Sequence, residues 1–182
     1  MKKIFLSLTV LIAFALPVLA QTARSSDDIL KEAYQKAAKE NKYVFVIFHA
    51  SWCGWCHKMD ASMNDATCKK FFDDNYVVAH LTVSESKGKE NLENPGAEEF
   101  KTKYNGKDQG LPFWLLFDKN GNLVSDSKIR QTGDGPEAGE NIGCPAAENE
   151  VQFFIGLLKK TSKLTDPQLE IIRKRFRQNE KD

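Results

Sequence analysis

The sequence predicts an α/β domain in which a central mixed β-sheet carries helices on both faces. Two observations support this prediction. Short, almost wholly apolar runs that are rich in β-branched and aromatic residues are typical of strands buried on both faces. These runs alternate with longer segments whose apolar residues recur at helical spacing. The resulting order is helix, strand, helix, strand, helix, strand, strand, helix, with one extra C-terminal helix, and it implies a mixed sheet covered on both faces.

The first 20 residues are expected to form a separate segment and are set apart from the predicted fold. A basic start at Lys2 and Lys3 precedes an apolar stretch from Ile4 to Leu16 and a small-residue ending at Ala20. This order predicts a secretory signal peptide that is cleaved after Ala20. The alternative is an uncleaved membrane anchor, but the apolar stretch is short for a span of about 20 residues. We therefore expect an exported protein, periplasmic or extracellular, that meets a membrane only through an uncleaved signal.

The mature chain, residues 21–182, has almost no net charge. Without Lys2 and Lys3, the 26 basic residues fall to 24, against 25 acidic ones. So small a charge gives no electrostatic basis for binding nucleic acid or an anionic membrane. The length suits one domain that buries its own core, and we expect a core at residues 29–160 with a helical extension at 161–182.

The first helix and the first strand have clear local signals. Ser25–Asp28 offers caps, and apolar residues then recur at helical spacing from Ile29 to Ala37, so we expect a helix that ends near Asn41. Tyr43–Phe48 is an unbroken apolar run of the length and composition that favour a buried strand.

Two more apolar runs and a turn complete the predicted sheet. Tyr76–Val83 and Phe113–Phe117 have strand composition. Asp118–Gly121 is typical of a turn, and Asn122–Ile129 is expected to return as an antiparallel partner.

Helical stretches lie between and after these strands. Gly54–Phe72 predicts a helix with a break near Asn64-Asp65, and Ala97–Tyr104 predicts a shorter one. Four glycines and a proline make Gly133–Gly143 a predicted loop. Ala146–Lys160 then restores helical periodicity.

The extra C-terminal helix is predicted from a cap at Thr165-Asp166-Pro167. Its basic run, Arg173–Arg175, is interleaved with Glu170 and Glu180. We interpret the run as a solvated helix face rather than a nucleic-acid patch.

The informative segment is Ala50–Met59, where Cys53 and Cys56 stand at C-x-x-C spacing between a buried strand and a helix. Such a pair can close a small disulfide or open to a dithiol. Unpaired N–H groups and the positive end of the helix dipole favour a thiolate at Cys53. Lowering a cysteine pKa from about 8.5 to about 7 takes only about 2 kcal/mol. We expect Cys53 to be the nucleophile and Cys56, one turn further in and more buried, to be the resolving thiol.

Trp52-Cys53-Gly54-Trp55-Cys56 after a buried strand resembles the thioredoxin family, and the likeness continues along the chain from about residue 29 to 160. The further matching segments are Asn94-Pro95-Gly96, Tyr104, Gly110-Leu111-Pro112 with Leu115-Leu116-Phe117, Lys119-Asn120-Gly121 and Ile142-Gly143. The resemblance implies the thioredoxin fold and a thiol–disulfide oxidoreductase without a cofactor. It also implies protein thiols and disulfides as partners, with a redox-partner protein that recycles the cysteine pair.

The resemblance assigns further residues to the site. Pro112 would be a cis proline that faces the cysteines, and Leu111 would offer backbone groups to a bound peptide; alternatively, Pro112 merely begins an edge strand. Trp52 would line the substrate groove, as in the family. Apart from the resemblance, we expect Trp55 to be the more exposed of the two, so that it could be a contact surface for protein substrates. The supporting positions are Gly54, His57 and Gly143.

The chain departs from the family pattern at two places. In thioredoxin the buried strand carries an acid that helps to move the proton of the resolving thiol, but the matching position here is Ile47. The dipeptide between the cysteines is Gly54-Trp55, which resembles neither the reducing members, with proline, nor the oxidising or isomerising ones, with histidine. The direction of the reaction therefore stays open.

The three histidines have different expected roles. His57 follows Cys53 by four residues on the same helix face. It could stabilise the thiolate when protonated or act as a base when neutral, or it could simply be an exposed helix residue. His49 and His80 lie on predicted strands, and we expect them to be packed core residues.

Two other functions use the same residues. Cys53, Cys56 and His57 also spell C-x-x-C-H, the attachment motif of a c-type haem in an electron-transfer protein. They could instead be soft ligands for copper or zinc, although no second ligand cluster is visible. A buried strand that runs directly into the motif, and the role for Pro112, favour the redox pair.

The spare cysteines, Cys68 and Cys144, are not expected to form a disulfide. Cys68 lies twelve residues after Cys56, about 18 Å along a continuous helix. Cys144 borders the site by resemblance, which puts the two beyond the 7 Å or so that a disulfide spans. We expect Cys68 to be inert, and Cys144 to lie near the Cys53 sulfur as a third thiol able to intercept a mixed disulfide, or to be a loop cysteine without a role.

Overall fold

The computed structural model describes residues 23–181, and its centre is a four-stranded sheet in the order β2-β1-β3-β4. β1 pairs in parallel with β2 and antiparallel with β3, which in turn pairs antiparallel with β4. The predicted mixed sheet is confirmed. The predicted signal peptide at residues 1–20 lies outside the described residues. The strands of this sheet are β1 (Tyr43–His49), β2 (Tyr76–Thr82), β3 (Phe113–Phe117) and β4 (Leu123–Asp126).

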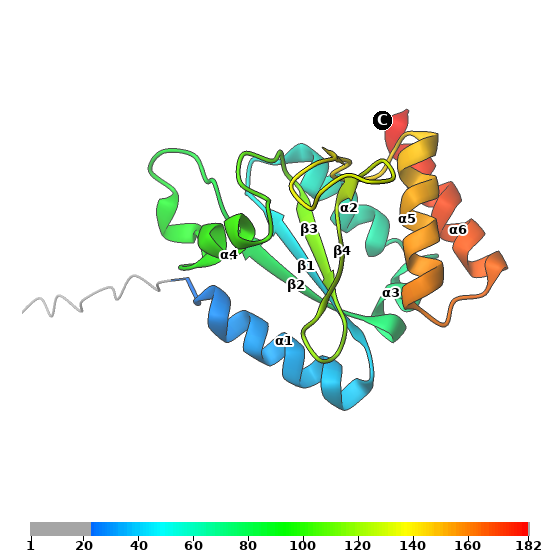
Figure 1. Cartoon of the computed structure of the whole chain (residues 1–182), viewed down its shortest axis with the longest axis horizontal. Helices are drawn as coiled ribbons and strands as arrows, with labels where there is room; N and C mark the ends of the chain where they lie inside the picture. The colour runs from blue at the N-terminus through cyan, green and yellow to red at the C-terminus, as the bar shows by residue number, and fades with distance from the viewer. Residues whose placement is uncertain (1–22, 182) are drawn as a thin grey trace, which may run out of the picture.

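Helices cover both faces of the sheet, as Figure 1 shows. One face packs on α1 and α4 through one apolar cluster, and the other packs on α2, α3, α5 and α6 through a second. The helices are α1 (Ser26–Glu40), α2 (Gly54–Met63), α3 (Lys69–Asn75), α4 (Ala97–Lys103), α5 (Glu148–Thr161) and α6 (Asp166–Arg177), with 3-10 turns η1 (Glu90–Leu92) and η2 (Gln178–Glu180).

The central strand β1 anchors both clusters. Its residues Val44–Phe48 are each at most 1% exposed. Alternate side chains enter opposite layers, with Phe45 and Ile47 on the α2 side and Val44 on the α1 side. Full burial of one such large apolar side chain stabilises the fold by about 1.5–3 kcal/mol. The strand is therefore a rigid base for the segment that follows it.

The predicted helix boundaries follow local caps. Ser25 Oγ accepts the backbone N–H of Asp28 at 3.2 Å, and Asn41 ends α1 in the left-handed conformation at φ 54°. The predicted break after Asn64 is confirmed, because Asp65 Oδ1 accepts the backbone N–H of Thr67 at 2.9 Å and holds a turn between α2 and α3.

The prediction that Asn122–Ile129 returns as one antiparallel partner is wrong in its length, because only β4 belongs to the main sheet. The chain leaves the main sheet after β4, and β5 (Lys128–Ile129) pairs antiparallel with β6 (Glu140–Asn141) in a separate two-stranded sheet. The predicted loop at Gly133–Gly143 therefore contains a short strand.

The buried side chain of Lys128 gives a physical reason for this second sheet. Lys128 is 1% exposed, and its ammonium group donates to the carbonyl oxygens of Asn105 at 3.2 Å, Pro136 at 3.0 Å and Glu137 at 3.1 Å. Burial lowers the pKa of this amine. A buried cation needs such partners, so it holds the glycine-rich segment against β5.

The C-terminal helix α6 is part of the core. Ile172 and Phe176 are fully buried in the cluster that contains Phe154 of α5. From residue 23 to 181, no helix combines the length and apolar character needed to cross a membrane.

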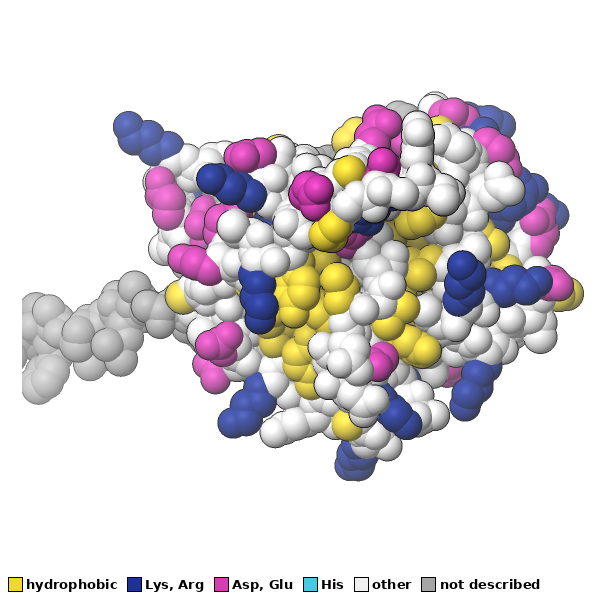
Figure 2. Space-filling model, in the orientation of Figure 1, with side chains coloured by type: hydrophobic (Ala, Val, Ile, Leu, Met, Phe, Trp, Pro, Cys, Tyr) yellow, Lys and Arg dark blue, Asp and Glu magenta, His cyan; other side chains and the backbone are white. Residues whose placement is uncertain are grey.

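Charged side chains lie mainly around the periphery in Figure 2, while apolar ones gather toward the middle of that face.

Candidate active site

The site begins where β1 ends and α2 starts. Cys53 is the N-cap residue of α2, and its sulfur accepts the backbone N–H of Cys56 at 3.1 Å. The two cysteines form a disulfide with Cα atoms 5.3 Å apart. Cys53 is 3% and Cys56 1% exposed, and both pack with Ala50 and Leu111 in a small apolar cluster. The helix terminus predicted for Cys53 is confirmed.

Two exposed tryptophans flank the disulfide. Trp52 is 56% exposed and donates its indole N–H to the carbonyl oxygen of Ser84 at 2.9 Å. Trp55 is 47% exposed, and the Lys58 ammonium group lies 4.4 Å from the centre of its ring. The expectation that Trp55 is the more exposed of the two is wrong, because the Lys58 ammonium group lies over part of its ring.

The start of β3 lies beside this pair. The Leu111–Pro112 peptide bond is cis. Gly143 has φ +53°, and a Cβ there would lie 3.4 Å from the Pro112 carbonyl oxygen. Asn141 Nδ2 donates to the carbonyl oxygens of Gly110 at 2.8 Å and Pro112 at 3.3 Å. Gly143 thus permits the close approach of its loop to Pro112. Asn141 holds the two loops together, and no sequence motif predicts this role.

A groove of about 240 Å³ lies between these loops and α2. It brings together three of the predicted site residues, Trp55, Leu111 and Gly143, whereas Trp52 lies outside it against Ser84. Its other lining residues include Ile142, Cys144 and Glu150.

His57 contacts the backbone that leads into the site. Its Nε2 lies 3.0 Å from the carbonyl oxygen of Ser51, and because a carbonyl only accepts, Nε2 carries the proton. Ser51 in turn donates from its backbone N–H and its hydroxyl to the Glu85 carboxylate at 2.6 and 2.7 Å. These bonds fix the loop before Cys53 and hold the pKa of Glu85 below its usual range, against the opposing effect of desolvation.

The two strand histidines are not the packed core residues that the sequence predicts. They lie half-buried between the sheet and α2, with ring centres 5.1 Å apart. His80 Nε2 is 2.8 Å from Asp60 Oδ1, and His49 Nε2 is 3.2 Å from Thr82 Oγ1. Polar partners at this edge keep them out of the apolar layer.

The spare cysteines are both buried and unpaired with each other, as expected. Burial raises the pKa of the Cys68 thiol, and it raises the pKa of the Cys144 thiol to about 12. Cys144 lines the groove but is only 4% exposed, and Asn179 Nδ2 lies 3.4 Å from its sulfur. A buried thiol with a raised pKa is a poor nucleophile, which argues against the interception of a mixed disulfide by Cys144 and favours the alternative of a loop cysteine without a role.

The C-x-x-C-H arrangement does not fit a c-type haem. Such a haem requires both sulfurs as thioethers and the His57 imidazole on iron. Here the sulfurs are bonded to each other under Leu111, and the His57 ring nitrogen is bonded to the Ser51 carbonyl. Within residues 23–181, no three His, Cys, Asp or Glu side chains gather closely enough to hold a metal ion.

Comparison with known proteins gives one family match. A family described as a thioredoxin-like domain matches residues 30–129, more than half of the chain. No curated protein sequence matches significantly.

Solved structures with similarity to this chain are more distant. A disulphide isomerase from Xylella fastidiosa Temecula1 is 20% identical over 63% of this chain and 80% of that chain, with a TM-score of 0.46. A structure described as DsbH oxidoreductase is 19% identical over 86% of this chain and 96% of its own, with a TM-score of 0.44. The C-terminal domain of DsbD from Neisseria meningitidis in the oxidised form is 15% identical, over 76% and 98%, with a TM-score of 0.44.

Proposed function

The chain belongs to the thioredoxin-like family, and on that premise we propose that it is an exported thiol–disulfide oxidoreductase that exchanges disulfides with protein substrates. The observation that carries the proposal is the Cys53–Cys56 disulfide at the N-terminus of α2, beside a groove and two exposed tryptophans.

The position of Cys53 supports its role as nucleophile. At a helix start, backbone N–H groups lack intrahelical partners, and the helix dipole favours negative charge. In the disulfide form the Cys53 sulfur accepts the Cys56 N–H at 3.1 Å, and the same group would stabilise a Cys53 thiolate in the reduced protein. That thiolate attacks a substrate disulfide and forms a mixed disulfide. Cys56 then attacks Cys53, and the substrate leaves reduced; the reverse sequence oxidises a substrate dithiol.

The surroundings of the pair suit an extended peptide. Trp52 and Trp55 offer aromatic surface on two sides of the cysteines, while Gly143 keeps the groove wall low beside Pro112. Leu111 lies between the groove and the disulfide, where its backbone can meet a bound chain. Aromatic anchors of this kind contribute strongly to protein recognition.

Each turnover leaves the cysteine pair in the opposite oxidation state. We therefore propose a redox-partner protein that resets it. The sequence pattern at residues 1–20 supports export to an oxidising compartment, where such a cycle is useful.

Trapping tests this function. In a Cys56→Ser variant, Cys53 should remain joined to clients as mixed disulfides that reductant releases, and a Cys53→Ser/Cys56→Ser variant should trap none. Equal trapping by both variants would contradict the proposal. Equilibration of the wild-type protein with glutathione buffers then gives the reduction potential, which decides between reductase, oxidase and isomerase.

A further inference from the structure

Resolution of a mixed disulfide requires the Cys56 thiol to lose its proton. Cys56 is 1% exposed, and an ordinary thiol, with a pKa of about 8.5, is almost wholly protonated at neutral pH. A positioned proton acceptor typically accelerates such a step by about 10²–10⁴-fold. The position of β1 at which the resemblance places an acid offers none, since Ile47 is fully buried and apolar.

The neighbouring strand supplies an ionisable group at the same level. Ile47 of β1 is in register with His80 of β2, so both side chains project from the same face of the sheet. That face is the one covered by α2, because Ile47 packs with Met59. An imidazole therefore stands one strand away from the place where the family has its acid.

Asp60 connects this imidazole to the active-site helix. It lies one turn after Cys56 on α2, where side chains four residues apart are neighbours with Cβ atoms about 5–6 Å apart. Its Oδ1 is 2.8 Å from His80 Nε2. The Asp60 and His80 side chains are 34% and 36% exposed. The pair thus begins one helical turn from the buried thiol and is partly open to solvent.

Other titratable groups surround the pair on the sheet side. The His49 ring of β1 lies 5.1 Å from the His80 ring, and Glu85 of the loop after β2 and His57 of α2 act electrostatically on His49. Burial lowers the pKa of His49, and His80 lowers it further, while Asp60 and Glu85 oppose the shift. This shift favours the neutral form of His49.

Asp60 also acts toward the groove side. The pKa of the Cys144 thiol, raised mainly by burial, is raised further by Glu150 and Asp60 and lowered by Lys58 and Arg175. One carboxylate therefore acts electrostatically on both His49 and the Cys144 thiol.

We propose that Asp60 and His80 act together as the proton acceptor for Cys56, an inference that rests on the proposed function. In the mixed disulfide between Cys53 and a substrate, the Cys56 proton passes through one water molecule to the pair. The Cys56 thiolate attacks the Cys53 sulfur, the Cys53–substrate bond breaks, and the substrate sulfur leaves as a thiolate that takes up a proton. Two electrons pass from the protein dithiol to the substrate, and the exposed side of His80 returns the stored proton to water.

A reaction with one equivalent of 5,5′-dithiobis(2-nitrobenzoate) separates the two steps. In the reduced protein, attack by Cys53 releases the first coloured thiolate, and resolution by Cys56 releases the second. Asp60→Asn and His80→Gln should leave the first phase unchanged and slow the second about 100-fold at pH 7. As pH rises, hydroxide can take the Cys56 proton directly, so the difference between the variants and wild type should narrow.

The controls separate this inference from the proposed function. Asp73→Asn removes an exposed carboxylate paired with Lys69 in α3 and should change neither phase. Asp60→Glu, which keeps the carboxylate, should restore part of the second phase. If Asp60→Asn does not fold, His80→Gln carries the same test.

Each remaining outcome decides the matter. A second phase unaffected at pH 7, or slowed equally at every pH, would overturn the assignment of Asp60 and His80 while leaving the oxidoreductase intact. Loss of the first phase from the wild-type protein would instead overturn the function itself.

Discussion

The N-terminal ends of α2 and α3 invite comparison, because each helix begins at a cysteine. Cys53 has extended backbone angles, φ −79° and ψ 98°, and its sulfur accepts the N–H of Cys56. Cys68 has φ −110° and ψ −32° and makes no side-chain cap bond; its sulfur lies 3.6 Å from the Thr67 hydroxyl. A cysteine at a helix start is therefore not sufficient for its sulfur to be stabilised by the helix. The backbone must also turn its sulfur onto the free N–H groups.

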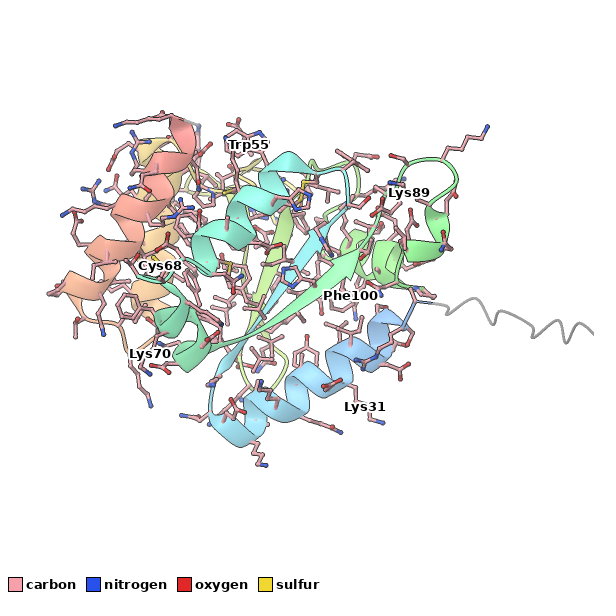
Figure 3. All side chains as sticks on the ribbon, turned by 180° about the vertical axis from the view of Figure 1, so that it is seen from behind. Lys31, Trp55, Cys68, Lys70, Lys89 and Phe100 are labelled. Atoms are coloured by element: carbon pink, nitrogen blue, oxygen red, sulfur yellow. A yellow bond between two sulfur atoms is a disulfide. The ribbon has the colours of Figure 1, made fainter. Side chains whose placement is uncertain are left out.

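The surroundings of the two helix starts differ as well. Trp52 and Trp55 are exposed on either side of Cys53, whereas Cys68 is fully buried in the apolar cluster with Met63 and Phe72. Figure 3 shows Trp55 near one end of α2 and Cys68 near the other. Cys53 is itself only 3% exposed, so the difference lies in the surroundings of the two sulfurs. Exposed aromatic side chains and free helix N–H groups at one helix start, and an apolar enclosure at the other, predict different chemistry for the same side chain, and four experiments test this difference.

The largest expected effect is on activity. Cys53→Ser should reduce the rate of insulin reduction by dithiothreitol to the uncatalysed background, because serine offers no redox-active sulfur. Cys68→Ser should retain most of the wild-type rate. The turbidity of precipitating insulin chains measures both. Full turnover by Cys53→Ser would show that the nucleophile is assigned wrongly.

The second effect is on thiol reactivity in the reduced protein. We expect iodoacetamide to modify Cys53 at neutral pH on the order of 10³-fold faster than Cys68 or Cys144, because only the thiolate reacts and burial keeps the other two protonated. Pulse labelling followed by peptide mass spectrometry gives the rates. The labelling in denaturant, where all cysteines should react alike, is the control. Comparable rates for Cys53 and Cys68 in the folded protein would remove the distinction between the two helix starts.

The third effect is on stability. Cys68→Ser should lower the free energy of unfolding by about 1–3 kcal/mol, since it buries a hydroxyl among apolar side chains. Cys144→Ser should cost less, because Asn179 Nδ2 already points at this sulfur and can donate to an oxygen instead. Urea unfolding of the reduced proteins compares the two. A larger loss at Cys144 than at Cys68 would contradict the burial argument.

The smallest effect concerns alkaline pH. The Cys144 thiol has its pKa raised from 9.0 to about 12 by burial. Between these values the unfolded chain releases a proton that the folded chain keeps, so the contribution of this thiol to stability is full below pH 9 and is lost as pH rises toward 12. At pH 10 the titration of Cys144 should lower the free energy of unfolding by about 1 kcal/mol. Cys144→Ala should therefore lose less stability than wild type between pH 8 and 10, and parallel losses would show that Cys144 does not titrate as proposed.

Much of the fold could be predicted from local sequence. Phe113–Phe117 forms a strand with the predicted bounds, α1 ends at the expected Asn41, and the break after Asn64 is present. The cysteine pair at the start of α2 was equally predictable, because a buried strand followed by C-x-x-C is itself a local pattern. Caps, turns and apolar periodicity act over a few neighbouring residues, so these signals can be read directly from the amino-acid sequence.

Contacts between distant segments were decided only by the tertiary structure. The pairing of β5 with β6 depends on a buried Lys128 ammonium that binds carbonyl groups from other loops. His80 meets Asp60 only because β2 lies beside β1 under α2. No local sequence pattern predicts these long-range contacts, because each residue has ordinary neighbours along the chain. The contacts form only when the elements pack together and exclude water. The sequence by itself thus determined where the redox pair stands, and the packing of the sheet against α2 decided which polar side chains surround it.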